Sequence, residues 1–141
     1  MKRILFCSSI FNLLLLLIVS TAQLDAQNRK ERDSLGITEI SYFDVDWLDS
    51  DGKEYLDRIE RFDERGELIE EIDYYKDGKI KLHIQYVYDG KLLMKEIYFD
   101  NKGDLDKTYT YEYDAEGLKI SKKYFDKKNR IYKEKRYRYK K

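Results

Sequence analysis

The chain of 141 residues is long enough for one domain, and 40% of its residues are charged. It has one cysteine, Cys7, near its start, so an intramolecular disulfide framework and a multi-cysteine metal site are excluded. It has no proline. The formal net charge of zero hides an asymmetry, because residues 28–75 hold 7 Lys/Arg and 16 Asp/Glu (net −9) and residues 76–141 hold 19 and 11 (net +8).

The first 26 residues have the pattern of a secretory signal peptide. Basic residues precede an apolar run centred on 13–19, LLLLLIV, and small residues follow at 20–22. A single membrane anchor is the alternative, but the apolar core is short for the ~20 residues of a spanning helix. We therefore expect a helical signal peptide over 1–26, cleaved after Ala22 or Ala26. Export to the periplasm, the cell envelope or the extracellular space follows from it, and cleavage would leave no thiol.

Residues 27–35 are polar and are expected to form a flexible leader to a β-repeat domain over 36–141. Within that domain, glycines recur at intervals of 12, 12, 13 and 14 residues, at 66, 78, 90, 103 and 117, and Asn129 follows after a further 12. An aromatic residue precedes each of these positions and an aliphatic residue follows soon after. Aspartate favours the start of a turn and glycine supplies positive φ, so each phrase predicts one hairpin turn.

The segments between the turns alternate with the period of a strand. Ile80, Leu82 and Ile84 fall on one side, and Tyr109, Tyr111 and Tyr113 share a side farther on. We predict an all-β antiparallel meander of about seven to eight strands, with repeats of 12–14 residues. The strands are expected near 36–44, 55–62, 67–75, 80–88, 92–99, 105–113, 118–125 and 131–139.

The alternation leaves the closure of the sheet open. The second face is not uniformly polar, because the pattern assigns to it Ile69, Val87, Tyr98, Phe125 and Tyr132. One possibility is an open, strongly twisted sheet with both faces covered by tyrosines and lysine stems. The other is a half-barrel around a tyrosine-rich interior.

The segment 111–117, YEYDAEG, resembles the core of the bacterial tyrosine–aspartate (YD, or Rhs) repeat, Y-x-Y-D-x-x-G. Residues 86–90, YVYDG, form a contracted copy, and 98–103 and 124–129 are variants without the spacer between the aromatics. The hairpins at 74–81, YYKDGKIK, and 88–103 also resemble MORN-type repeats, although the second glycine of those units is missing. Both resemblances cover about 62–139, and both imply a sheet of β-hairpins.

For three candidate sites, a structural explanation of the residues is stronger than a functional one. His83 is the only histidine and lies mid-strand without an evident catalytic partner, so we expect a surface histidine. The carboxylates of 44–52, DVDWLDSDG, do not match a calcium loop, because Trp47 and Arg58 fall at ligand positions. The turn aspartates are expected to cap their own turns, and they are Asp63, Asp77, Asp89, Asp100, Asp114 and Asp126.

Two surfaces are candidates for binding. A stripe of tyrosines recurs on successive strands and would suit a sugar chain or a peptide, although cross-strand aromatic pairs also stabilise a thin sheet by about 0.2–1 kcal/mol each. The C-terminal end interleaves basic and aromatic residues, and its structural explanation is an edge strand protected by lysines. The candidate binding residues are Tyr109, Tyr111, Tyr113, Tyr124, Lys133, Lys135, Arg136, Tyr137, Arg138 and Tyr139.

The sequence predicts a non-enzymatic exported module that binds a protein or an anionic glycan through the tyrosine face or the basic end. The alternative is a structural protein that self-associates acidic end to basic end, because the two charge blocks are complementary. An enzyme is disfavoured because no catalytic constellation is evident. No cofactor, no metal and no nucleic-acid partner are expected.

Overall fold

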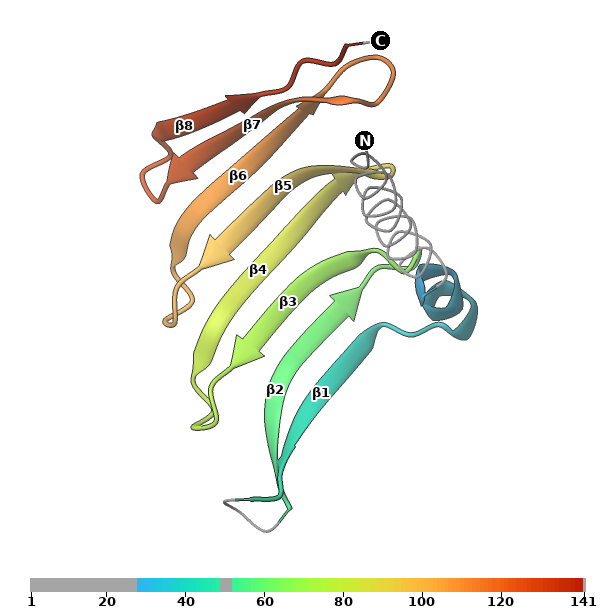
Figure 1. The fold of residues 1–141 in the computed structure, drawn as a ribbon, viewed down its shortest axis with the longest axis vertical. Coiled ribbons are helices and arrows are strands. Elements are labelled where there is room, and N and C mark those ends of the chain that lie inside the picture. The colour runs from blue at the N-terminus through green and yellow to red at the C-terminus, as the bar shows by residue number, and fades with distance from the viewer. Residues whose placement is uncertain (1–27, 49–51, 141) are drawn as a thin grey trace, which may run out of the picture.

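The computed structural model describes residues 28–48 and 52–140, so the signal peptide expected over 1–26 lies outside the described residues. One antiparallel sheet of eight strands makes up almost all of the described chain, and its strands follow one another in chain order (Figure 1). They are β1 (Glu39–Asp46), β2 (Lys53–Phe62), β3 (Leu68–Tyr74), β4 (Ile80–Asp89), β5 (Leu92–Phe99), β6 (Leu105–Tyr113), β7 (Lys119–Asp126) and β8 (Ile131–Arg136). The predicted meander is confirmed, and the sheet is open, because β1 and β8 are its two edges and do not pair.

The recurring phrases of the sequence are the hairpin turns. The N–H of Asp63 donates to the Glu67 carbonyl, and the N–H of Gly66 donates back to the Asp63 carbonyl, both at 2.9 Å. The carboxylate of Asp63 also accepts the N–H groups of Arg65 and Glu67 at 2.9 Å. The same four bonds recur in the turns that begin at Asp100, Asp114 and Asp126. The expectation that these aspartates cap their own turns is confirmed at these four positions.

Positive φ explains the residue that closes each turn. Gly103 has φ of 85°, and Asn129 has φ of 59° in the corresponding place of the β7–β8 turn. A left-handed backbone is costly for most side chains and is tolerated best by glycine and then by asparagine. The substitution of asparagine at the last repeat therefore keeps the turn geometry.

Each hairpin also contains a β-bulge in its second strand. Between β2 and β3, Arg61 lies opposite Glu70 and Phe62 lies opposite Leu68, so Ile69 has no direct partner. The same shift leaves one unpaired residue in the second strand of each other hairpin, namely Asp57, Lys81, Met94, Asp106, Ile120 and Tyr132. Bulges bend a strand and increase its twist, and their repetition accounts for the curved layer in Figure 1.

The bulges correct the assignment of two side chains to the second face. Tyr98 lies opposite Ile84 and its ring packs against Tyr109, and Tyr132 packs against Tyr124. Simple alternation fails here because one extra residue per hairpin moves the following side chains to the other face. We use the name tyrosine face for the face that carries Ile84, Tyr86, Tyr88, Tyr98, Tyr109, Tyr111, Tyr113 and Tyr124.

The sheet is a single layer with little buried interior. The buried apolar residues of the described chain are Phe62, Ile72, Ile84 and Tyr111, and none of their side chains is completely enclosed. Domains are usually built from two packed layers around one core. Here the aromatic rings and the stems of long charged side chains lie across the strands and take over part of that role.

The expectation of a flexible leader over 27–35 is corrected by the structure, in which residues 28–35 are helical. The helix packs on the β2–β3 turn: Arg29 Nη1 bonds Glu67 Oε1 at 2.9 Å, and the Arg32 guanidinium lies 4.3 Å from the centre of the Phe62 ring. A polar segment without an apolar stripe gave no sign of this packing. Within the described residues, no helix has the length and apolar character needed to cross a membrane.

Candidate binding surface

The tyrosine face is built from rings that stack across neighbouring strands. The centroid of the Tyr109 ring lies 4.8 Å from that of Tyr98 on β5 and 4.6 Å from that of Tyr124 on β7. Tyr132 extends the row to β8, at 6.1 Å from Tyr124. Tilted and edge-on pairs at these distances are favourable beyond the area they bury. The row therefore ties four consecutive strands together.

A lysine and a glutamate lie inside this row. The Lys122 ammonium donates to the Tyr111 hydroxyl at 2.6 Å and lies 3.7 Å from a Glu96 oxygen. It also lies 4.5 Å from the ring centre of Tyr109 and 5.3 Å from that of Tyr124. The Tyr111 hydroxyl donates to Glu96 in turn. Lys122 thus fills the aromatic cage that an external cation would need.

The hydroxyl groups on this face are engaged within the protein. Tyr98 donates to Glu96 at 2.9 Å, Tyr86 donates to Glu71 at 3.2 Å, and Tyr113 donates to the Leu93 carbonyl at 2.8 Å. Burial, and then its hydrogen bond to Tyr132 and the charge of Glu96, raise the pKa of Tyr109 to about 12. Burial followed by neighbouring carboxylates likewise raises the pKa of Tyr88 to about 12.

These contacts decide the role of the candidate tyrosines on β6 and β7. Tyr111 is buried at 4% exposure, and Tyr109, Tyr113 and Tyr124 are half-buried. A platform for a sugar ring needs an accessible aromatic face, whereas the Lys122 ammonium lies over the rings of Tyr109, Tyr111 and Tyr124. The hydroxyl of Tyr113 is bonded to the Leu93 carbonyl. The geometry favours a structural role for all four.

The basic candidates lie together on the last strand. Lys133, Lys135, Arg136 and Arg138 are all exposed, and β8 is the edge of the sheet. Arg136 forms an ion pair with Glu134 at 2.9 Å. We call this surface the basic edge, and it consists of β8 with residues 137–140.

Tyr137 and Tyr139 continue the basic edge beyond the last strand. The N–H of Tyr137 donates to the Ile120 carbonyl at 3.0 Å, which keeps the chain in register with β7. The Tyr139 hydroxyl donates to the Lys119 carbonyl at 2.8 Å. Both rings stay partly exposed, so the basic edge presents aromatic and cationic groups side by side.

The opposite edge of the sheet has the opposite character. β1 carries Glu39, Asp44 and Asp46 and no basic residue. Tyr42, Phe43 and Val45 of this strand are exposed, and Phe43 reaches 56% exposure. We call this strand the acidic edge. Figure 1 shows that the acidic and basic edges lie at opposite ends of the layer.

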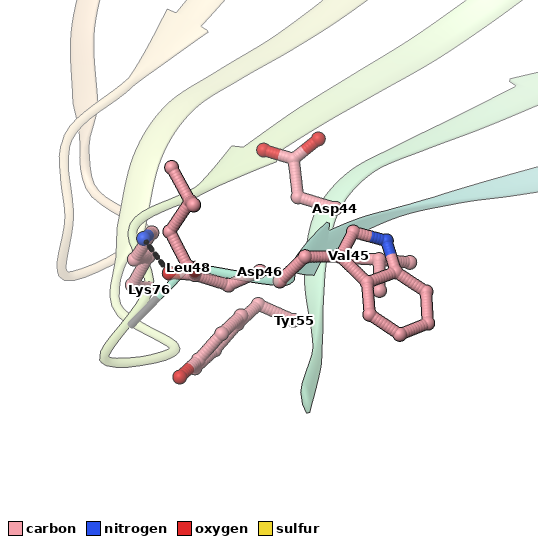
Figure 2. Close-up of a pocket in the computed structure, with 7 residues that line it drawn as sticks. Asp44, Val45, Asp46, Leu48, Tyr55 and Lys76 are labelled. Carbon is pink, nitrogen blue, oxygen red and sulfur yellow. Dashed lines mark hydrogen bonds and ion pairs between the residues drawn. The ribbon is translucent and has the colours of Figure 1, made fainter. Parts of the chain in front are cut away.

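A shallow hollow lies at the end of the acidic edge (Figure 2). Lys76 reaches from the β3–β4 turn and bonds Asp46 at 2.7 Å, and its ammonium lies 5.5 Å from the centre of the Tyr55 ring. Trp47 and Leu48, at 76% and 96% exposure, form an apolar rim. Because one of its carboxylates is already bonded to a lysine, the hollow is a poor cation site.

His83 requires a correction, because it is not an ordinary surface side chain. It is half-buried on the face opposite the tyrosines, where its ring stacks on Phe99 at 4.6 Å. Its Nε2 lies 2.8 Å from Glu70, which also accepts bonds from Gln85 and Arg61. Burial opposes the ionised form of Glu70, but these bonds prevail and lower its pKa to about 2.

The sequence analysis missed Glu70, Glu96 and Lys122 as the centres of these clusters. A signal was present for Glu96 and Lys122, since each lies two residues before a tyrosine of the same strand and therefore faces the same side as that tyrosine. No protein-family model matches the chain, and no curated protein matches it. The YD and MORN resemblances therefore stay predictions from the pattern of the sequence.

Proposed function

We propose that the protein is a non-enzymatic exported module that binds an acidic partner, a protein or an anionic glycan, at the basic edge. The observation that carries this proposal is the contrast between the two candidate surfaces. The tyrosines on β6 and β7 contact other side chains of the protein. The basic edge has four exposed cationic side chains and two partly exposed rings.

An edge strand offers two kinds of recognition at once. Its outward backbone N–H and C=O groups can pair with an extended segment of a partner protein, and its side chains select the charge of that segment. An anionic glycan would use the side chains alone. Electrostatic attraction of this kind raises the association rate and weakens as salt is added.

The amino-terminal pattern supports export, and export removes nucleic acid from the expected partners. The acidic edge supports a second candidate, a structural protein in which copies associate through complementary ends. Both candidates assign binding to the basic edge and differ in the identity of the partner.

Binding to heparin and to poly-glutamate tests this proposal, with the protein isolated from the cells that express it. A variant with Lys133, Lys135, Arg136 and Arg138 all changed to Glu should lose binding to both polymers. The control variant carries the same change at four exposed lysines in inner strands and turns, namely Lys81, Lys91, Lys102 and Lys127. Equal losses in the two variants, or retained binding in the first, would contradict a site at the basic edge.

A further inference from the structure

We infer that the acidic partner of the basic edge is the acidic edge of a second copy of this chain, so that sheets join by pairing β8 with β1. This inference rests on the proposed function and names its partner. It follows from the topology, the direction of the backbone groups and the charges of the two edges.

The number of strands permits a continuous sheet. The eight described strands alternate in direction, so β8 runs antiparallel to β1. A second copy placed by continuing the same strand-to-strand step would present its β1 antiparallel to β8. The tyrosine faces of both copies would then lie on the same side, as the side chains of directly paired residues do between neighbouring strands within one copy.

The backbone shows which residues of β1 point outward. The carbonyls of Thr38 and Asp46 both accept bonds from the β2 side, from Phe62 and Gly52. Since backbone groups alternate along a strand, even-numbered residues of β1 bond inward and odd-numbered residues, among them Phe43, present N–H and C=O groups to the free edge.

The same reasoning applies to β8. The N–H of Tyr137 bonds inward to Ile120, so Lys133 and Lys135 also bond inward, whereas Glu134 and Arg136 point their backbone groups outward. The side chains of Lys133 and Lys135 lie on the tyrosine face, opposite Tyr124 and Lys122. Those of Glu134 and Arg136 lie on the other face.

Superposing the two edges gives a register with complementary side chains. When Arg136 pairs with Phe43 of the second copy, Lys135 falls opposite Asp44, and both side chains lie on the tyrosine face. Lys133 falls opposite Asp46, whose carboxylate already bonds Lys76, so the pair of Lys135 and Asp44 carries the charge complementarity. Opposite charges directly across two strands are stabilising and like charges are destabilising. The stem of Arg136 would cover the exposed Phe43 ring on the other face.

The charges also select the direction of assembly. Two basic edges would place lysines opposite lysines, and two acidic edges would place carboxylates opposite carboxylates, so only the mixed pairing is favoured. A mixed pairing is heterologous, and because each step carries the twist of the sheet it generates an open helical filament. The charges of the two edges thus disfavour pairing between like edges and allow pairing of a basic edge with an acidic edge.

Sedimentation velocity of the isolated protein over a concentration series tests the inference. We expect species heavier than the monomer at low salt, and a shift toward monomer at ~1 M salt, where the screening length falls to ~3 Å. Asp44→Lys alone and Lys135→Asp alone should each raise the concentration for half-assembly at least ~10-fold. The double variant Asp44→Lys/Lys135→Asp should assemble like the parent, because the pair is restored with its signs exchanged.

A backbone variant gives an independent measurement. Phe43→Pro removes an outward N–H without touching the ladder to β2, so it should abolish assembly while circular dichroism stays that of the parent. Phe43→Thr is the matched control and should still assemble. A monomer at every concentration, or assembly that survives both Phe43→Pro and the single charge changes, overturns the inference. If heparin still binds at the basic edge of such a monomer, only the identity of the partner is wrong and the proposed function stands.

Discussion

The ammonium group of Lys122 donates a hydrogen bond of 2.6 Å to the hydroxyl of Tyr111, and both groups lie on one face of a sheet that forms a single layer within the described residues. A sheet of one layer cannot remove many side chains from water, yet Tyr111 is buried at 4% exposure. The ammonium groups of Lys119 and Lys122 lie over its ring, at 4.3 and 4.7 Å from the ring centre. Polar and charged side chains therefore supply burial that aliphatic residues supply in ordinary domains.

Lys122 and Lys123 are adjacent in β7 and point to opposite faces, which makes them a matched pair for a stability test. Lys122→Met removes the donor to Tyr111 and the ion-pair partner of Glu96, and it should lower the free energy of unfolding by about 1–3 kcal/mol. Lys123→Met breaks only an exposed pair with Glu112 and should cost less than ~1 kcal/mol. Urea unfolding measures both, and equal losses would show that the cage around Lys122 has no structural role.

Gly66 and Gly103 close equivalent turns but differ in their surroundings. Both have positive φ, so alanine at either position should cost about 1–2 kcal/mol from the backbone alone. At Gly103 a Cβ would meet nothing within 4 Å, whereas at Gly66 it would lie 2.6 Å from the Arg29 carbonyl oxygen in the helix. Gly66→Ala should therefore displace the helix as well.

Hydrogen exchange of the 28–35 segment measures that displacement. We expect faster exchange there in Gly66→Ala and parental exchange in Gly103→Ala. Unchanged protection in both variants would mean that the helix does not depend on close contact with the β2–β3 turn.

Stability in acid should depend on Glu70. Hydrogen bonds from His83, Gln85 and Arg61 outweigh burial and hold its pKa at about 2 in the folded protein, against an ordinary value of 4.5. A depressed carboxyl pKa contributes stability that is fully present above pH 4.5 and is lost as the pH falls toward 2. The free energy of unfolding should fall over this window, and it should fall less steeply in Glu70→Gln. Parallel curves for the two proteins would exclude this role.

We expect a second loss of stability at alkaline pH, caused by ionisation of tyrosines on the tyrosine face. Burial is the main reason that the pKa values of Tyr88 and Tyr109 rise to about 12 from 10.0. For a raised pKa, the contribution to stability is present below pH 10 and disappears as the pH rises through 12. Tyrosinate absorbance should therefore develop later in the native protein than in denaturant, and strand content should fall over the same range. Identical titrations in both conditions would contradict the buried row.

The sequence was sufficient for the strands and turns because both depend on local chemistry. Gly78 and Gly103 stand where positive φ is required, and four of the six turn aspartates bond N–H groups two and four residues ahead, namely Asp63, Asp100, Asp114 and Asp126. The expected strands agree with the structure within one residue from β3 to β7. They differ most at the two edges of the sheet. β1 was expected to begin at residue 36 and begins at Glu39, and β8 was expected to end at residue 139 and ends at Arg136.

Features that depend on contacts between distant segments were not predictable in the same way. The bulge at Met94 reverses which face Tyr98 occupies, and no residue type marks it. The helix at 28–35 is held by contacts with a turn more than thirty residues away, for example the bond between Arg32 and Gly66 with a separation of 34 residues. The same reason applies to the ten candidate binding residues. The burial of the tyrosines on β6 and β7 arises from the packing of neighbouring strands, which the local sequence does not reveal.

The central claim is that the basic edge binds and that the tyrosine face stabilises the fold. The most direct measurement is the change in backbone amide chemical shifts when a peptide with the β1 sequence EISYFDVD is added to the isolated protein. We predict large shifts at the outward amides of Glu134 and Arg136, and none beyond error at Tyr109 or Tyr111. Shifts centred on those two tyrosines, with β8 unchanged, would contradict the account.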